Sequence, residues 1–73
     1  MEISPAQCRA ARGLLDWTQG QLAQKVGVAL RTIQDFENNK RTPLAIVRSS
    51  IKQAFENAGI EFLSKEGLRR RDG

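Results

Sequence analysis

The sequence predicts an all-α fold, a compact bundle of four to five helices with a C-terminal extension that is a short β-strand, a hairpin or a frayed tail. Apolar residues recur three and four positions apart through four segments, the spacing that brings side chains to one face of a helix. Ser, Thr, Gly and Pro stand at the borders of these segments, where helices begin and end. The chain has 73 residues, of which 40% are apolar, and this suits one small globular domain.

The first two helices have the clearest boundary signals. Residues 4–7 (Ser-Pro-Ala-Gln) and 18–21 (Thr-Gln-Gly-Gln) each form a capping box, in which the first and fourth side chains satisfy backbone N–H groups at a helix start. They predict helices over 5–15 and 19–26. Gly27 follows the second helix directly, where a residue with positive φ is needed to end it.

The third and fourth helices are predicted with less distinct ends. The third spans about 30–38 and is expected to end at the Asn pair 38–39, because Asn tolerates positive φ. The fourth is expected to begin at Pro43, with Thr42 as its cap, and to end at Gly59. The apolar positions assigned to its buried face are Leu44, Val47, Ile51, Ala54, Phe55 and Ala58.

The chain divides into a main domain, residues 1–59, and a C-terminal extension, residues 60–73. The alternation at 60–63 favours a short strand. Residues 64–67 are suited to a turn, and residues 68–71 would return as a second strand. A frayed tail is the competing interpretation of everything beyond the first strand.

Charge favours an anionic partner. Lys and Arg number 12 against 8 Asp and Glu, which gives a net charge of +4 and a pI near 10.0. A basic domain of this size is typical of proteins that bind nucleic acid or another anionic surface. A solvated basic surface without any partner would give the same net charge, so charge alone does not show whether the protein has an anionic partner.

Several classes of function are disfavoured by composition. The chain has no His and one Cys, so the usual bases, nucleophiles and metal-ligand clusters are missing. We therefore expect no enzyme, no metal site and no cofactor. The lone Cys8 lies among apolar helix positions, where packing is favoured over redox chemistry. Without a disulfide, a long apolar run or a signal-peptide pattern, the protein is expected in the cytoplasm, with no membrane contact.

The two short helices on either side of Gly27 carry the functional prediction. The small side chain of Ala23 allows these helices to cross closely, and Gly27 permits the sharp turn between them. Val28 and Ile33 would anchor the third helix against the second. This arrangement turns the exposed side of the third helix outward, where it can enter the major groove of DNA, which is wide enough for an α-helix.

The residues around this turn resemble the Cro and lambda-repressor-like family of helix-turn-helix proteins, also called the XRE family. The resemblance begins with residues 18–28, TQGQLAQKVGV, and continues through Thr32-Ile33, Phe36-Glu37 and residues 40–43, KRTP. It covers about residues 8–59. It implies a bundle of four or five helices, a cytoplasmic location and a homodimer that regulates transcription.

The resemblance also implies roles for single residues. Gln19 matches a Gln that contacts a DNA phosphate, and Arg12 and Glu37 match a pair that forms an internal ion pair. The residues implied as base readers, on the exposed part of the third helix, are Leu30, Arg31, Thr32, Gln34 and Asp35. The other residues implied as phosphate contacts, in the loop that follows, are Asn38, Lys40 and Arg41.

Some of these roles have plainer alternatives. Arg31 can bind guanine with two hydrogen bonds, but it can also form only a surface pair with Asp35 at i, i+4. Thr32 and Gln34 are equally well explained as solvated surface. Arg69, Arg70 and Arg71 are either phosphate contacts or a solubilising tail. Trp17 is expected in the core rather than against a base.

Two positions depart from the family pattern. Ala29 stands where Ser or Thr usually caps the recognition helix, and the missing cap is expected to cost about 0.5–2 kcal/mol. Leu30 is apolar at a position where polar side chains are common, and it is suited to contact a thymine methyl group. Both departures bear on the DNA sequence recognised rather than on the fold.

The leading prediction is a regulator of transcription that binds double-stranded DNA sequence-specifically. It would act as a homodimer that reads inverted half-sites with the third helix in the major groove. Ile60, Phe62 and Leu63 have no obvious place in the bundle, so we expect the dimer to form through the C-terminal segment. No small-molecule ligand is expected. The alternative is a protein-interaction module, antitoxin-like or an antagonist, that uses the same fold.

Overall fold

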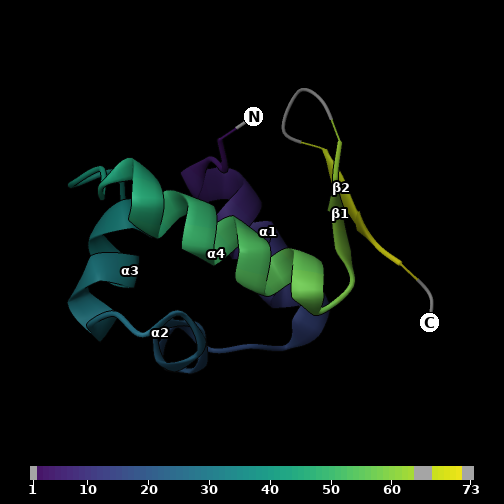
Figure 1. Ribbon diagram of the computed structural model, residues 1–73, viewed down its shortest axis with the longest axis horizontal. Coiled ribbons are helices and arrows are strands. Elements are labelled where there is room, and N and C mark those ends of the chain that lie inside the picture. Colours follow the sequence, from purple (N-terminus) through teal and green to yellow (C-terminus); the bar gives the residue numbers. More distant parts are fainter. Residues whose placement is uncertain (1, 64–66, 72–73) are drawn as a thin grey trace.

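Four helices and a two-stranded antiparallel hairpin make up the part of the chain that the computed structural model describes, residues 2–63 and 67–71 (Figure 1). The elements are α1 (Pro5–Leu15), α2 (Gln19–Val26), α3 (Leu30–Glu37), α4 (Ala45–Asn57), β1 (Ile60–Phe62) and β2 (Leu68–Arg70). The predicted all-α bundle with a C-terminal hairpin is therefore confirmed. Residues 64–66 of the predicted turn lie outside the described residues.

The first two helices begin and end where their caps predict. The backbone N–H of Gln7 donates to Ser4 Oγ at 3.1 Å, and the Ser4 N–H donates back to Gln7 Oε1 at 3.0 Å. Thr18 and Gln21 exchange the same two hydrogen bonds, at 3.0 and 2.8 Å. Gly27 ends α2 with a φ of 84°, a left-handed conformation that costs glycine little because it has no Cβ. Both capping boxes are confirmed.

The predicted start of α4 is wrong. The helix begins at Ala45, with Leu44 at the N-cap position and no side-chain cap, so Thr42 and Pro43 stay in the loop. The loop doubles back onto α3 before α4 begins, because the N–H groups of Lys40 and Arg41 donate to the Asp35 carbonyl. The Pro43 carbonyl accepts a hydrogen bond from Arg48 Nε at 3.2 Å, which satisfies this oxygen outside the helix.

A second error follows from the first. Leu44, assigned to the buried face of α4, is 75% exposed, because it precedes the first helical turn. The far ends of α3 and α4 are one and two residues shorter than predicted, at Glu37 and Asn57. Asn39 and Gly59 then take positive φ values of 60° and 99°, as the chain turns away from each helix.

The core gathers side chains from every helix and from β1. Its buried apolar residues are Ile3, Cys8, Ala11, Leu22, Ala23, Ile33, Phe36, Ile51, Phe55 and Ile60. Trp17 stacks on Phe55 with ring centroids 5.6 Å apart. Phe62 packs edge-on against the same Phe55 ring, with centroids 6.3 Å apart. Trp17 is thus part of the packing, as expected. Ile60 is only 1% exposed, so the expectation that it lacks a place in the bundle is wrong.

The hairpin closes one end of the molecule. β1 pairs with β2 in antiparallel register, with Glu61 opposite Arg69, and packs on α4 while β2 packs on α1. The hairpin lies at the opposite end of the long axis from α3 (Figure 1). The two strands were predicted, and a frayed tail is excluded for the described residues 67–71.

Candidate nucleic-acid interface

A tight turn between α2 and α3 holds the candidate recognition helix in place. The backbone N–H groups of Gly27 and Val28 both donate to the Ala23 carbonyl, at 2.8 and 3.0 Å. Ala23 is buried, so its small side chain lets α2 and α3 approach each other, and Ile33 on α3 is buried in the same core. Ala29 makes no side-chain cap, as predicted. The stability of α3 therefore depends more on packing against the core than on capping at its ends.

The outer side of α3 carries most of the residues predicted as base readers. Leu30 and Arg31 are exposed, whereas Thr32, Gln34 and Asp35 are half-buried. Arg31 Nε lies 3.2 Å from Asp35 Oδ1, and the Arg31 side chain is 77% exposed. The structure thus forms the surface pair weighed as an alternative for Arg31. Such a pair contributes little to stability, because water screens it.

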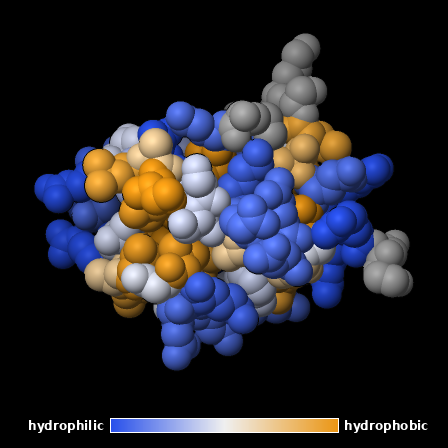
Figure 2. All heavy atoms as spheres, in the orientation of Figure 1, coloured by the Kyte–Doolittle hydropathy of each residue, from blue (hydrophilic) through white to orange (hydrophobic). Residues whose placement is uncertain are grey.

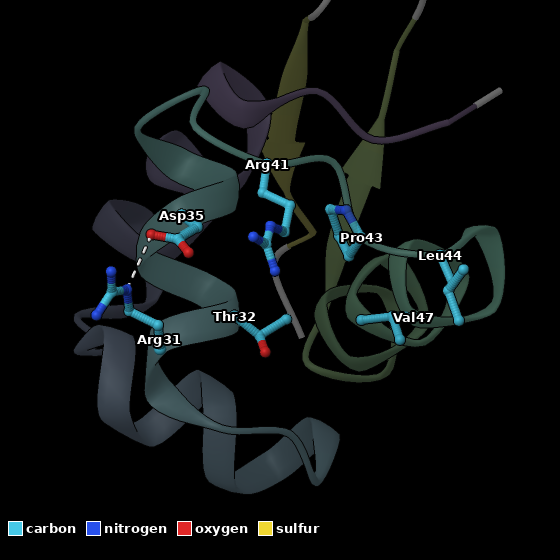
Figure 3. Close-up of a pocket in the computed structure, with 7 residues that line it drawn as sticks. All are labelled: Arg31, Thr32, Asp35, Arg41, Pro43, Leu44 and Val47. Carbon is cyan, nitrogen blue, oxygen red and sulfur yellow. Dashed lines mark hydrogen bonds and ion pairs between the residues drawn. The ribbon is translucent and has the colours of Figure 1, made fainter.

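A cleft of about 280 Å³ runs between α3 and the start of α4 (Figure 3). Thr32 and Arg41 point into this cleft from opposite sides, and the Arg31–Asp35 pair lies on its outer rim. Its third side is apolar and consists of Pro43, Leu44 and Val47. Sequence reasoning missed this apolar wall, because it placed Pro43 and Leu44 within α4.

The loop after α3 carries two cations, Lys40 and Arg41, and Arg41 lines the cleft. The N–H groups of Lys40 and Arg41 both donate to the Asp35 carbonyl, at 2.8 and 3.3 Å, so the loop folds back onto the helix. The residues predicted there as phosphate contacts, Asn38, Lys40 and Arg41, are all exposed. They share the end of the molecule that presents α3.

Glu37 is the centre of a buried polar network behind α3. Its side chain is 1% exposed, and it accepts hydrogen bonds from Arg12 Nε and Nη2, each at 2.7 Å. Cys8 Sγ and Gln19 Nε2 each donate to it at 3.0 Å. Arg9, which was not singled out from the sequence, donates to the Glu37 carbonyl at the end of α3. The network therefore joins α1, α2 and α3.

The network holds Glu37 in its charged form. Burial is the largest single influence and raises the pKa of Glu37, but the hydrogen bonds from Arg12, Cys8 and Gln19 together outweigh it, so the pKa lies below its usual value. The bond to Glu37 likewise raises the pKa of Arg12. Burial, and then the hydrogen bond to Glu37, raise the pKa of the Cys8 thiol, which keeps it protonated and unreactive.

The lowered pKa of Glu37 predicts a loss of stability in acid. The folded protein binds this proton less readily than the unfolded chain, whose Glu has a pKa of about 4.3. The stabilisation is therefore complete above that value and is lost as the pH falls through the lower, folded-state pKa. The free energy of unfolding, measured with urea from pH 7 to pH 3, is expected to decline below about pH 4.3. In Glu37→Gln the part of this decline that comes from protonation of Glu37 should be absent. If the free energy of unfolding of that variant declines equally in acid, the decline comes from other carboxylates.

Gln19 occupies a position between the network and the surface. It was singled out as a phosphate contact, and the structure directs one N–H of its side-chain amide to Glu37. A primary amide has a second N–H that can serve another acceptor. Gln19 also stands at the first position of α2, where backbone N–H groups favour anions. The network thus sets the orientation of the side chain without using all of its donors.

The side chains of the three C-terminal arginines contact other residues of the same chain. Arg70 Nη1 donates to the Leu14 carbonyl at 3.3 Å, and Arg71 Nη2 donates to the Glu56 carbonyl at 3.0 Å. These oxygens lie in the last turns of α1 and α4, where a cation is favoured. Arg69 forms an ion pair with Glu61 across the hairpin. The two alternatives considered for the arginines were a phosphate contact and a solubilising tail. Neither predicted hydrogen bonds to carbonyls at the ends of α1 and α4.

Neither a metal-binding cluster nor a membrane-spanning helix occurs in the described parts of the chain. Within residues 2–63 and 67–71, His, Cys, Asp and Glu side chains form no group of three suited to a metal ion. None of the helices in the same residues has the length and apolar content to span a bilayer.

Comparison with known proteins agrees with this geometry. A family model described as helix-turn-helix matches residues 9–47, which are 39 of the 73 residues and include α2, the turn, α3 and the loop that follows. No curated protein sequence matches the chain. The matched family binds DNA and is typically non-catalytic. The chain belongs to the helix-turn-helix family of the XRE, or Cro/C1, type, and it is a DNA-binding domain.

Proposed function

We propose that this protein regulates transcription by binding a specific duplex DNA site, as a homodimer that reads inverted half-sites. The observation that carries the proposal is the exposed outer side of α3, with Arg31 on the rim of a cleft whose other border bears Arg41. An α-helix with its side chains is about 10–12 Å across, so α3 can lie in a major groove about 12 Å wide. A cytoplasmic location is part of the same proposal.

Arg31 is the principal base reader in this proposal. Its Nε donates to Asp35, which orients the guanidinium and leaves the two terminal nitrogens for O6 and N7 of guanine. The Leu30 side chain is suited to make an apolar contact with a thymine methyl group. Thr32, Gln34 and Asp35 would complete the reading surface.

The phosphate contacts flank the reading surface on both sides. Lys40 and Arg41 supply charge from the loop, and Gln19 supplies an amide at the start of α2. Asn38 would add a neutral donor. Contacts to phosphates fix the register of the protein on the duplex and carry little sequence information.

The size of this surface supports the proposed homodimer. One α3 covers a single half-site, and dimers of this type bind half-sites about 34–36 Å apart, one turn of DNA. The two copies would then be related by a two-fold axis, and the site would be an inverted repeat.

The affinity for DNA is expected to fall steeply with salt. The probe is the duplex that the protein selects from a randomised pool, and binding is followed by fluorescence anisotropy at several salt concentrations. Each neutralised phosphate contributes about −0.9 to the slope of log K against log salt, so four loop cations in a dimer predict about −3 to −4. Failure to select any sequence, or a slope near zero, would overturn the proposed function.

A further inference from the structure

Glu37 holds the side chain of Gln19 from inside the molecule. Gln19 is the first residue of α2 and is half-buried, and its Nε2 donates to Glu37 Oε1 at 3.0 Å. The two ends of a side-chain amide differ, because the nitrogen donates hydrogen bonds and the oxygen accepts them. The contact with Glu37 therefore decides which end of the amide faces inward and which donor is left for a partner outside.

The charge of Glu37 fixes this orientation. An ionised carboxylate accepts hydrogen bonds and donates none, so it can face the nitrogen of the Gln19 amide but not its oxygen. Glu37 is ionised at neutral pH, because its pKa lies below the usual value for a glutamate. The nitrogen thus keeps one N–H bound to Glu37, and its second N–H is left for another acceptor.

The carboxylate that orients Gln19 is itself fixed. It has about four acceptor positions, and four hydrogen bonds reach it. Arg12 Nη2 and Gln19 donate to Oε1, and Arg12 Nε and Cys8 donate to Oε2. The Glu37 side chain is 1% exposed, so water does not replace these donors. Any rotation of the carboxylate breaks several bonds at once, and Glu37 is therefore a rigid support for the amide.

The outer side of α2 is open to a partner. Leu22 and Ala23 are buried, whereas Gln24 and Lys25 are exposed. Figure 2 shows hydrophilic side chains at the edge of the molecule where α2 lies. A partner that approaches α2 therefore meets polar side chains, among them the outer part of the half-buried Gln19.

We propose that Glu37 is a positioning residue for DNA binding, which turns the free N–H of Gln19 toward a backbone phosphate. This inference rests on the proposed function, in which Gln19 contacts a phosphate. A side chain that is ordered before binding loses less conformational entropy in the complex. A Gln that is free to turn over would also present its oxygen, which a phosphate repels because both are acceptors. Glu37 removes both obstacles.

A double-mutant cycle separates this role from a structural one. Gln19→Met removes the amide and keeps the length of the side chain. Glu37→Gln offers a donor and an acceptor in place of the carboxylate, so it no longer selects the nitrogen of Gln19. Cys8→Ala is the control, because it removes a donor from Oε2 of the same carboxylate and leaves Oε1 to Gln19. The three variants and the Gln19→Met, Glu37→Gln double variant are titrated with a duplex that carries one selected half-site. Urea unfolding gives the folded fraction that corrects each affinity.

We expect Gln19→Met to weaken binding about tenfold and Glu37→Gln about three- to fivefold, since one hydrogen bond to a charged group is lost or misdirected. The double variant should bind no more weakly than Gln19→Met. Cys8→Ala should keep its affinity within about twofold. Additive losses in the double variant, or a loss in Cys8→Ala equal to that in Glu37→Gln, would overturn the inference, because Glu37 would then act through the fold.

Two of the proteins separate failure of this inference from failure of the proposed function. Unchanged affinity in Gln19→Met would overturn the inference and leave DNA binding intact. If the natural sequence binds no duplex, the proposed function and this inference fail together.

If Glu37→Gln does not fold, NMR spectroscopy of the natural sequence provides the test. One side-chain amide proton of Gln19 should exchange slowly with water in the free protein, because it is bound to Glu37. The signal of the second proton should shift when the duplex is added. Equal exchange of both protons, or no shift in either signal, would overturn the inference.

Discussion

Replacing Arg12 with Met is expected to lower the free energy of unfolding by about 3–5 kcal/mol, the largest effect of any single change considered for this chain. The substitution leaves the Glu37 carboxylate buried, at 1% side-chain exposure, with only Cys8 and Gln19 to stabilise its charge. A domain of this size has a total stability of about 4–11 kcal/mol. The variant should therefore be partly unfolded at physiological temperature, as measured by urea denaturation followed by circular dichroism.

The same variant should reverse its response to acid. Burial is the largest single influence on the pKa of Glu37, so we expect this pKa to rise above its value in the unfolded chain once the hydrogen bonds from Arg12 are lost. A carboxyl with a raised folded-state pKa is least costly when protonated, so Arg12→Met should regain stability as the pH falls toward 4, where the natural sequence begins to lose it.

The matched control is Arg69→Met. It also removes the cationic partner of a Glu, but the pair with Glu61 lies on the surface of the hairpin, and its loss should cost less than about 1 kcal/mol. Similar losses in the two variants, or an unchanged acid response in Arg12→Met, would show that Glu37 does not depend on this ion pair.

The parts of the fold that depend on neighbouring residues were predicted best from the sequence. The caps of α1 and α2 are contacts between residues three positions apart, so their residue types reveal them. α4 has no such cap, and its start depends on how the loop folds back on α3. Local signals at Thr42 and Pro43 therefore gave a start two residues too early.

Long-range contacts were the hardest to anticipate. The hydrogen bond from Cys8 to Glu37 spans 29 positions, and the bond from Gln19 to Glu37 spans 18. Neither follows from periodicity, which identified Cys8 only as a buried position. The pairing of Arg12 with Glu37 was implied by the family resemblance alone. The burial of Ile60 depends on a turn at Gly59 that aims β1 at α4, a direction that alternation of residue types does not specify.

This burial changes how the C-terminal segment can be tested. Deleting residues 60–73 would remove Ile60 from the core and the Arg71 cap from α4, so the shortened chain is expected to unfold whatever its role in assembly. Point substitutions at exposed positions, such as Leu63, separate assembly from folding.

The second large effect is expected on DNA recognition, where Arg31 and Lys40 should behave differently. Arg31→Ala should remove discrimination at one base pair in each half-site, at a cost of about 1–3 kcal/mol, because two hydrogen bonds to a guanine are lost. Lys40→Ala should weaken binding to all sequences nearly equally and reduce the salt slope by about one unit per protomer. Both side chains are exposed, so both variants should fold.

The measurement is a titration of each variant against the selected duplex and its single-base variants, at two salt concentrations. Asp35→Asn provides a further comparison, because it keeps Arg31 but weakens the contact that orients its guanidinium. It should lower the same base preference by a smaller factor than Arg31→Ala. If Arg31→Ala keeps its full base preference while Lys40→Ala loses it, the two roles are wrongly assigned. The reading function would then pass to Leu30, Gln34 or Asp35, and the Arg31–Asp35 pair would be an ordinary surface contact.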